Sequence, residues 1–459
     1  MDREPLIACE HCASVYRRRA LQRDEIAACA RCGTRLWRYS RLGPADWLAI
    51  TVAALIVFGV ANAYPVASLS VQGVTQRATL WDALLITWQQ GHWAVALMTG
   101  LAGFGLPLLQ LLVLAWVLAP MAQGRPPPAM GTAIRVLGWM QPWSMVPVFL
   151  LGVLVSVVKL AGMAAVRPEI GLAGFAILTL LLTLLGRLSP RVLWRLAEGH
   201  GVAPVHWPRP GPGEALAGCH ACGQVQAVPG APRQAEAAHR CLRCGAALHL
   251  RKPDHLARTW ALLLAAAILY IPANALPVMR ISTLLGDSDH TILGGVVELW
   301  QSGSWDIALI VFIASVAVPL TKLLALSLLA LLVQWRSTAN LRQRTRLYEL
   351  VEFIGQWSML DVFVVILLAA LADFQGLMQI SAGAGAAAFG MVVILTMLAA
   401  MSFDPRRGWD VEAQASQAAR PAPATPLPDG PPASADRPAV RAAVATTLPY
   451  PEPNPQEPR

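Results

Sequence analysis

All eight cysteines of this 459-residue chain fall in four Cys-x-x-Cys pairs. The first two pairs, CEHC and CARC, are separated by 16 residues, and the last two, CHAC and CLRC, by 18. Two such pairs at this spacing are typical of a zinc ribbon, in which two tight turns supply four thiolates. Glycines that favour such turns follow three of the pairs, at Gly33, Gly223 and Gly245. The expected Zn²⁺ ligands are Cys9, Cys12, Cys29, Cys32, Cys219, Cys222, Cys241 and Cys244.

Four thiolates close the coordination shell of zinc, so both ions are expected to be structural rather than catalytic. Each ribbon is too small for a core of its own and would take its folding free energy from the metal. An iron centre is the main alternative for these cysteines. A redox dithiol would need one pair at a helix start, and a reducing cytoplasm disfavours disulfide bonds.

A second candidate site is a pair of charges inside two neighbouring apolar segments. The run 307–333 carries a single charge, Lys322, and its 27 residues would reach about 40 Å as a helix, enough to cross a bilayer. A lysine at the centre of a membrane helix costs about 2.5 to 3.5 kcal/mol, so it usually faces a bundle interior and has a partner. Asp361, in the next apolar run, lies at a similar depth from the same face, and we expect the two to pair.

Three more polar residues are assigned to this site. Ser358 lies three positions before Asp361, and Ser315 seven before Lys322, so each serine shares a helix face with a charge. Thr321 adjoins the lysine and follows a proline that would loosen the helix and free backbone carbonyls. The alternative is that the lysine only snorkels or forms a structural salt bridge.

Composition places these sites in a membrane protein, because 56% of the residues are hydrophobic and only 14% are charged. We predict an all-α polytopic protein with eight spans, apart from the β-structured ribbons. The spans are near 47–67, 93–119, 143–166, 170–188, 256–278, 305–333, 350–374 and 384–401. Arginines flank the spans mainly on one side, which predicts that both termini lie in the cytoplasm. Much of the net charge of +9 is this topology signal, so no nucleic-acid partner is required.

The chain contains two consecutive copies of a unit that consists of one ribbon and four helices. ANAYPV at 61–66 matches ANALPV at 273–278, and WQQGHW at 88–93 matches WQSGSW at 300–305. Each unit has an even number of spans, so the two share one orientation. The predicted domains are a zinc ribbon (1–42), a four-helix bundle (43–196), a linker (197–213), a second ribbon (214–252), a second bundle (253–403) and a disordered Pro/Ala-rich tail (404–459).

The copies differ at the charged site. Lys322 aligns with Gln110, and Asp361 aligns with Pro147. Since the first unit lacks both charges, we expect the chemistry in the second bundle and a scaffold, or half of a shared cavity, in the first.

Paired ribbons that each precede four spans, together with WSMxDVF at 357–363 and PLTKL at 319–323, resemble the paraquat-inducible protein A family. The resemblance covers about residues 9–406. It implies a multi-pass protein of the bacterial inner membrane. It also implies a periplasmic partner built of MCE domains, which forms a tunnel for lipids between the inner and outer membranes.

The leading hypothesis is therefore a subunit of a lipid transport system, not an enzyme. It would pass phospholipid between the inner membrane and the MCE tunnel, with Lys322 and Asp361 binding a headgroup or relaying protons. No Gly-x4-Gly-Lys-Ser/Thr loop is present, so we expect a proton gradient rather than ATP to supply energy. Two alternatives remain, a non-transporting anchor for the tunnel and a zinc or thiol sensor of membrane stress.

Overall fold

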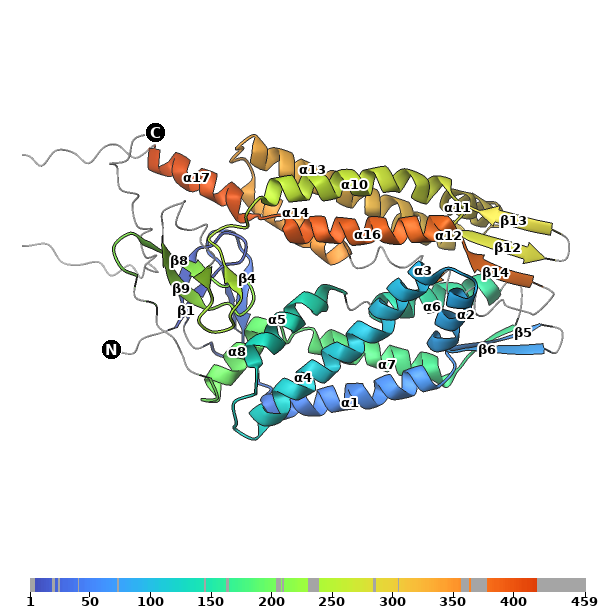
Figure 1. The fold of residues 1–459 in the computed structure, drawn as a ribbon, viewed down its shortest axis with the longest axis horizontal. Helices are drawn as coiled ribbons and strands as arrows, with labels where there is room; N and C mark the ends of the chain where they lie inside the picture. The colour runs from blue at the N-terminus through green and yellow to red at the C-terminus, as the bar shows by residue number, and fades with distance from the viewer. Residues whose placement is uncertain are drawn as a thin grey trace, which may run out of the picture.

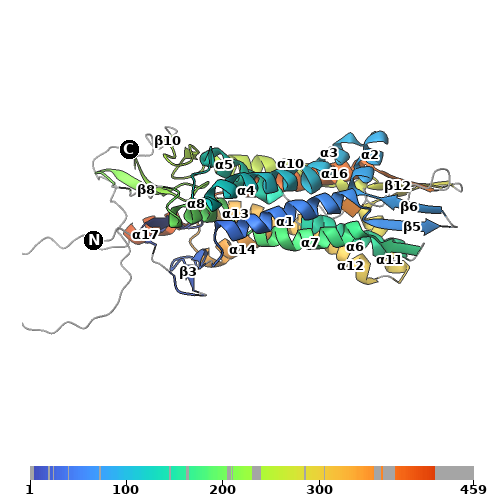
Figure 2. The ribbon, with the colours of Figure 1, turned by 90° about the horizontal axis from the view of Figure 1, so that it is seen from below.

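The computed structural model describes most of the chain between residues 5 and 418. The residues outside this description are 1–4, 19–20, 24, 40, 72–73, 144–145, 162–164, 204–207, 209, 230–238, 284–285, 304, 356–362, 365–377 and 419–459. The molecule is elongated, and its long helices run roughly along its length (Figures 1 and 2). The cysteine-rich hairpins lie at one end and a second group of hairpins lies at the other.

The helices of the first repeat form one half of the molecule (Figure 1). They are α1 (Pro44–Ala63), α2 (Leu80–Gln89), α3 (Trp93–Gly100), the π-helix η1 (Leu101–Gly105), α4 (Leu106–Ala122), α5 (Met130–Met140), the 3₁₀ turn η2 (Gln141–Trp143), α6 (Val146–Ala161) and α7 (Ile170–Leu185). Helix α1 packs against both α4 and α7. Gly174 permits the close approach of α7, because a Cβ added there would lie 2.9 Å from the Cα of Ala61.

The second repeat builds the other half with the same order of elements. Its helices are α10 (His255–Ala275), α11 (Ile292–Gln301), α12 (Trp305–Phe312), the π-helix η3 (Ile313–Ala317), α13 (Val318–Gln334), α14 (Leu341–Gly355) and α16 (Ala384–Ser402). The tightest packing here is between α10 and α16. Helices α2 and α11 are short and follow the first long helix of each repeat, and each is preceded by a threonine whose side chain caps its first turn.

Six helical stretches in the described residues are long and apolar enough to cross a membrane. There are seven if α7 and the following helix α8 (Pro190–Gly199), which are bent by 62°, count as one span. They correspond to seven of the eight predicted spans. Most of the remaining one, 350–374, lies outside the described residues.

One hydrophobic core joins the two halves. It includes Phe149 and Phe175 of the first repeat together with Phe389 of the second. At the contact between the halves, the rings of Phe149 and Phe363 meet edge to face with centroids 5.5 Å apart. These two phenylalanines occupy equivalent positions in the repeat, so the halves pack through matching residues.

Two antiparallel sheets of three strands cap the end far from the cysteines (Figures 1 and 2). The first has the order β6-β5-β7 and the second β13-β12-β14. The strands are β5 (Ala67–Val71), β6 (Val74–Ala78), β7 (Ala165–Pro168), β12 (Met279–Thr283), β13 (Gly286–His290) and β14 (Met378–Ala382). The prediction of an all-α fold outside the ribbons was wrong here. Strands of four or five residues leave too short a pattern, and β7 and β14 each pair with a strand about 100 positions earlier.

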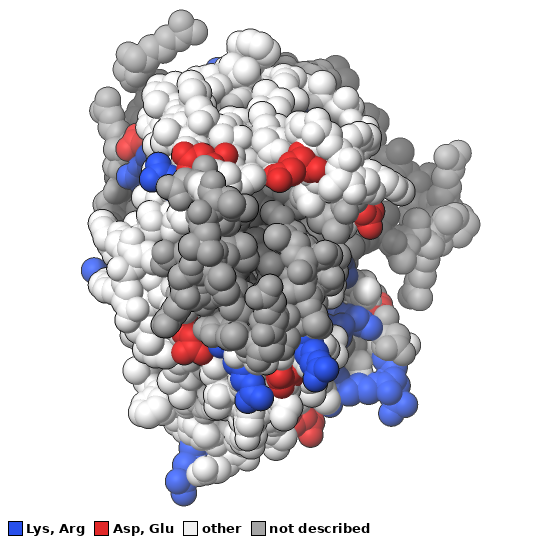
Figure 3. All heavy atoms as spheres, turned by 90° about the vertical axis from the view of Figure 1, so that its right-hand side faces the viewer, with Lys and Arg blue, Asp and Glu red and all other residues white. Residues whose placement is uncertain are grey.

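Charged side chains are sparse on the described part of this capped end. Figure 3 shows them as small separate groups of both signs on a largely uncharged surface. Arg280 and Asp289, for example, form an ion pair of 3.2 Å across the β12–β13 hairpin. This end therefore carries no large patch of one charge within the described residues.

Each cysteine pair lies in the turn of a short antiparallel hairpin, as expected for two ribbons. The first ribbon contains β1 (Leu6–Ala8), β2 (Val15–Arg17), β3 (Ile26–Ala28) and β4 (Arg35–Arg38). The second contains β8 (Glu214–Gly218), β9 (Val225–Pro229), β10 (His239–Arg240) and β11 (Ala247–Leu248). Strand pairing runs β1–β2, β3–β4, β8–β9 and β10–β11.

A short helix follows the last span of each repeat. Helix α8 begins with Ser189, whose hydroxyl accepts a hydrogen bond from the Val192 amide, and has a proline at its first position. Its counterpart α17 (Arg406–Ala418) falls in the segment that we predicted to be a disordered tail from residue 404. The tail prediction was therefore too broad. Composition hid a helix whose Trp409 is 97% buried against the first ribbon and α14.

Candidate functional site

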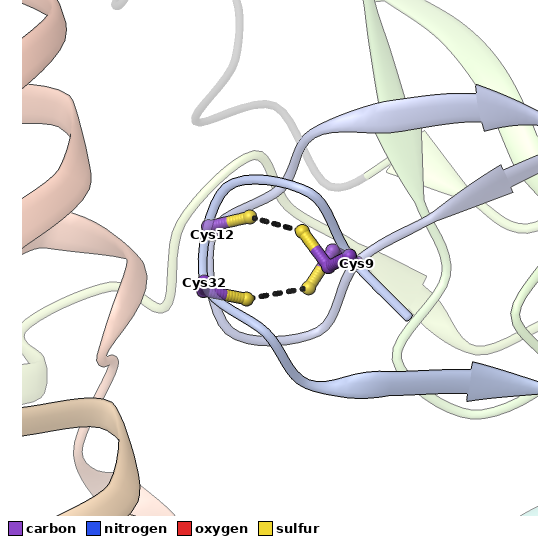
Figure 4. A group of neighbouring side chains, drawn as sticks. Cys9, Cys12 and Cys32 are labelled. Carbon is purple, nitrogen blue, oxygen red and sulfur yellow. Dashed lines mark hydrogen bonds between the residues drawn. The ribbon is translucent and has the colours of Figure 1, made fainter. Parts of the chain in front are cut away.

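The first ribbon brings its four thiols together. The Sγ atoms of Cys9 and Cys32 are 3.4 Å apart, and those of Cys12 and Cys29 are also 3.4 Å apart. Figure 4 shows the labelled cysteines pointing toward one another from the two hairpin turns. A tetrahedron with metal–sulfur bonds of about 2.3 Å has edges of about 3.8 Å. The four thiols are thus arranged to hold one metal ion.

The second ribbon repeats this arrangement. Its Sγ distances are 3.6 Å between Cys219 and Cys244 and 3.6 Å between Cys222 and Cys241. All eight cysteines are buried and none forms a disulfide bond. Both sets therefore could bind a metal, and soft thiolate donors in a tetrahedral set suit Zn²⁺ or iron.

The same backbone turn supports all four cysteine pairs. In each, the residue after the second cysteine donates its amide to the carbonyl of the first, at 2.8 to 3.0 Å. That residue has a left-handed φ of 84° at Gly33, 75° at Gly223 and 69° at Gly245. The fourth position is Ala13, with φ of 60°. The sequence motif found the three glycines, and only the structure shows that an alanine takes the same conformation.

The first ribbon docks on the second repeat. The guanidinium of Arg31, between Cys29 and Cys32, lies 5.0 Å from the ring centre of Trp409 in α17 and pairs with Glu412 at 2.9 Å. Arg406, also in α17, donates from Nε to the carbonyl of Glu10 at 2.8 Å. The four-cysteine cluster of the first repeat is thereby attached to the last described helix of the chain.

The second ribbon docks on the first repeat through matching residues. Arg243, between Cys241 and Cys244, lies 4.9 Å from the ring centre of Trp194 in α8 and pairs with Glu198. Arg191, also in α8, donates to the carbonyl of His220 at 3.0 Å. Each ribbon thus binds the helix that ends the other repeat. The two contacts together connect the start and the end of both repeats.

The two ribbons also share charges with α8. Glu198 accepts from Arg18 of the first ribbon at 3.0 Å and from Arg243 of the second. Burial, together with the nearby charge of Arg18, lowers the pKa of Arg243 to about 10. Burial likewise lowers the pKa of Arg18. One carboxylate therefore stabilises two crowded guanidinium groups.

The predicted charged site is only partly within the described residues. Lys322 is 97% buried in α13, and its Nζ has no hydrogen-bond partner among the described residues. Ser315 is fully buried and donates from Oγ to the Val311 carbonyl at 2.6 Å. Thr321 is exposed, so α13 directs it away from the buried lysine. Asp361 and Ser358 lie outside the described residues.

A π-helical turn precedes this lysine. The turn η3 contains Ser315 and ends just before α13, which has Pro319 in its first turn. The first repeat has the turn η1 and Pro107 at the equivalent positions. Such turns are rare in proteins, and those that occur often lie at functional sites. The aligned prolines were the available sequence signal, but they indicated a loosened helix rather than a specific turn.

Phe363, in the WSMxDVF segment, is described and lies between the two halves. Besides Phe149 it approaches η1, because a Cβ added at Gly103 would lie 3.3 Å from the Phe363 ring. The residue at the equivalent position of the second repeat is Ser315. The π-helical turn of the first repeat thus forms part of the packing surface for the second.

A model of the family described as paraquat-inducible protein A matches residues 45–198 and 256–412. The chain belongs to this family. Each matched segment ends within the helix on which a ribbon docks, α8 or α17. The family unit therefore includes the docking helix as well as the bundle.

Relatives that match along most of the chain support the assignment. Intermembrane transport protein PqiA of Escherichia coli K12 is 33% identical over 416 residues, which are 88% of this chain and 95% of the relative. A probable intermembrane transport protein of Haemophilus influenzae is 30% identical over 88% of this chain and 94% of its own. Lipophilic envelope-spanning tunnel protein A of E. coli K12 is 30% identical over 88% and 90%. No solved structure matches the chain.

Proposed function

We propose that this protein is the inner-membrane subunit of a lipid transport system. In this proposal it passes phospholipid between the inner membrane and a periplasmic tunnel of MCE domains. The names of its relatives support a role in intermembrane transport and connect the family with an envelope-spanning tunnel. The relatives are named as transport proteins, which fits a non-enzymatic role.

The observation that carries the proposal is the environment of Lys322. An ammonium in a membrane helix costs free energy unless another group compensates it. Within the described residues Lys322 is buried and its Nζ lacks a hydrogen-bond acceptor. A lipid phosphate, or the carboxylate of Asp361, would supply one. We assign the transport site to Lys322 and Asp361, with Ser315 and Ser358 beside them, and give Thr321 a weaker role because it is exposed.

The proposed topology has eight spans with both termini and both ribbons in the cytoplasm. The described spans number six or seven, and an eighth over 350–374 would give each repeat four. The two capping sheets would then lie on the periplasmic side, where an MCE partner could reach them. Exposed tryptophans on α2 and α11, such as Trp81 and Trp300, would lie at that membrane surface.

The metal in both ribbons is proposed to be Zn²⁺ with a structural role. Each set of four cysteines would complete the coordination shell and leave no position for a reacting group. The Arg31–Trp409 and Arg243–Trp194 contacts are made by residues that lie between ligands. Metal binding would therefore hold the docking arginines in place and connect the repeats.

Complementation of a strain with an envelope defect tests the charged site. Lys322→Ala and Asp361→Ala should each abolish complementation at normal protein levels. Gln110→Ala, at the position in the first repeat that aligns with Lys322, is the matched control and should retain function. Mass spectrometry of co-purified lipid should show less bound phospholipid in the two charge variants only.

These variants also separate the alternative functions. A passive anchor for the tunnel would tolerate loss of both charges but not of contacts at the capped end. A zinc or thiol sensor would release metal or oxidise reversibly under mild stress, which metal and free-thiol assays on the purified protein would detect. Full activity of both charge variants would exclude the proposed site.

A further inference from the structure

A cavity of about 60 Å³ lies between the two ribbons and α8. This is space for roughly four water molecules. Both ribbons and the helix that connects them to the membrane contribute to its walls. The arginines that line it are Arg18, Arg35, Arg191, Arg195 and Arg243.

The cavity wall has an excess of positive charge. Its two carboxylates, Glu10 and Glu198, are both engaged already. Glu198 pairs with Arg18 and Arg243, and Glu10 pairs with Arg191. Five guanidinium groups thus face two carboxylates in the described wall, which leaves an excess of three positive charges.

Two of these arginines have unused hydrogen-bonding capacity. Within the described residues Arg195 makes one hydrogen bond, to the Leu36 carbonyl at 3.4 Å. The buried Nε of Arg243 has no acceptor there. A buried donor without an acceptor costs about 1 to 3 kcal/mol, and more when it is charged. An anion in the cavity would remove this cost.

The other docking helix shows that this charge is not needed to hold a ribbon. Arg191 and Trp194 of α8 correspond to Arg406 and Trp409 of α17, which make the same two contacts with the other ribbon. The position of Arg195, however, corresponds to Asp410, which forms an ion pair with Arg251. The α17 side is therefore neutralised by the chain's own carboxylate, whereas the α8 side is not.

We propose that this cavity binds a phosphate group, supplied by inorganic phosphate, a nucleotide or the headgroup of an anionic lipid. Guanidinium groups bind phosphate oxygens through pairs of charge-assisted hydrogen bonds. The bound group would contact Arg18 of the first ribbon, Arg195 of α8 and Arg243 of the second ribbon. It would thus strengthen the contact between the two ribbons. This site is separate from the proposed transport site in the second bundle.

Binding to the full-length, metal-loaded protein in detergent tests the proposal. Three probes are compared at constant ionic strength: radiolabelled inorganic phosphate, ATP and dioctanoyl phosphatidylglycerol. We expect saturable binding of at least one probe at one equivalent per chain. The probe that binds most tightly identifies the source of the phosphate group.

Variants assign the binding to the cavity. Arg195→Gln should weaken binding by about tenfold or more, since a charge-assisted contact is lost. Arg187→Gln, which removes an exposed arginine outside the cavity wall, is the matched control and should change affinity less than about twofold. Unchanged metal content verifies that both variants are folded, and Arg195→Lys, which keeps the charge but loses the paired geometry, replaces Arg195→Gln if that variant misfolds. Equal affinities of the Arg195 and Arg187 variants, or no saturable binding of any probe to the parent protein, would overturn the proposal.

Discussion

The two halves of the membrane region share one skeleton but differ in charge. In each half a π-helical turn is followed by a proline and then by a buried polar side chain, Gln110 in α4 and Lys322 in α13. Each is 97% buried, and each has a polar atom without a partner among the described residues. The position is therefore polar in both copies, and only the second copy makes it charged. The irregular helix belongs to the shared fold, whereas the charge distinguishes the second copy.

The end of the molecule that carries the ribbons shows the same relation. Both ribbons dock through an arginine stacked on a tryptophan, but Arg195 on one side corresponds to Asp410 on the other. Repetition thus preserves the contacts that hold the parts together. The differences mark the positions where we propose ligands.

Loss of one metal ion should have the largest effect and should affect the two docking helices differently. Cys29→Ser should reduce the metal content from two ions to one and unfold the first ribbon, because zinc ribbons of this size gain about 10 to 16 kcal/mol from metal binding. Hydrogen exchange should then rise more in α17, which the first ribbon covers, than in α8, which keeps its contacts with the second ribbon. Cys241→Ser should give the reverse pattern. Equal loss of protection in both helices would contradict the crossed docking.

Two equivalent glycines should respond alike. A Cβ on Gly171 would lie 2.4 Å from the Tyr64 carbonyl oxygen, and one on Gly385 would lie 2.6 Å from that of Leu276. Alanine at either position should cost about 3 kcal/mol of stability or more, since a backbone must move. Thermal unfolding in detergent measures the effect. Gly59→Ala, which meets nothing within 4 Å in the interior of α1, should instead be neutral or slightly stabilising.

Placing a lysine in the first half tests whether the charged position needs a partner there. Gln110→Lys should destabilise the protein by about 2.5 to 3.5 kcal/mol, the cost of a lysine at this depth without a partner. Adding Pro147→Asp, which copies Asp361, should recover part of that loss if the two positions face each other. Gln110→Met serves as the size-matched neutral control and should cost less than about 1.5 kcal/mol. Thermal unfolding of the parent protein, the single variants Gln110→Lys and Pro147→Asp, and the double variant gives the coupling energy, and a value of zero would count against pairing of Lys322 with Asp361.

The smallest expected effect concerns the one cysteine turn without glycine. Ala13→Gly should stabilise the first ribbon by about 1 kcal/mol, because alanine at a φ of 60° pays a steric cost that glycine avoids. Metal affinity in a competition with a chelator should rise by about fivefold, which is that free energy expressed as a ratio. Unchanged affinity would show that the alanine turn is relaxed.

Motifs that depend on neighbouring residues could be predicted well. The eight cysteines were identified as two sets of four, and the structure brings each set together. The long apolar helices and the repeat were also predicted, since a run of about 20 apolar residues is enough to indicate a span. The capping sheets were missed because their strands are short and their partners are remote. The exposure of Thr321 was missed because its assignment depended on its position beside Lys322 in the sequence, and adjacent residues of a helix point about 100° apart.

By itself the sequence determined the two sets of four cysteines, the long apolar helices and the position at which the two copies differ in charge, because each depends on residue type and local spacing. Only the tertiary structure decided that each ribbon docks on the helix that ends the other repeat. It also decided that Arg18, Arg195 and Arg243 share one cavity. Those arginines come from three separate segments, and their proximity results from the packing of two ribbons on one helix, which no local pattern encodes.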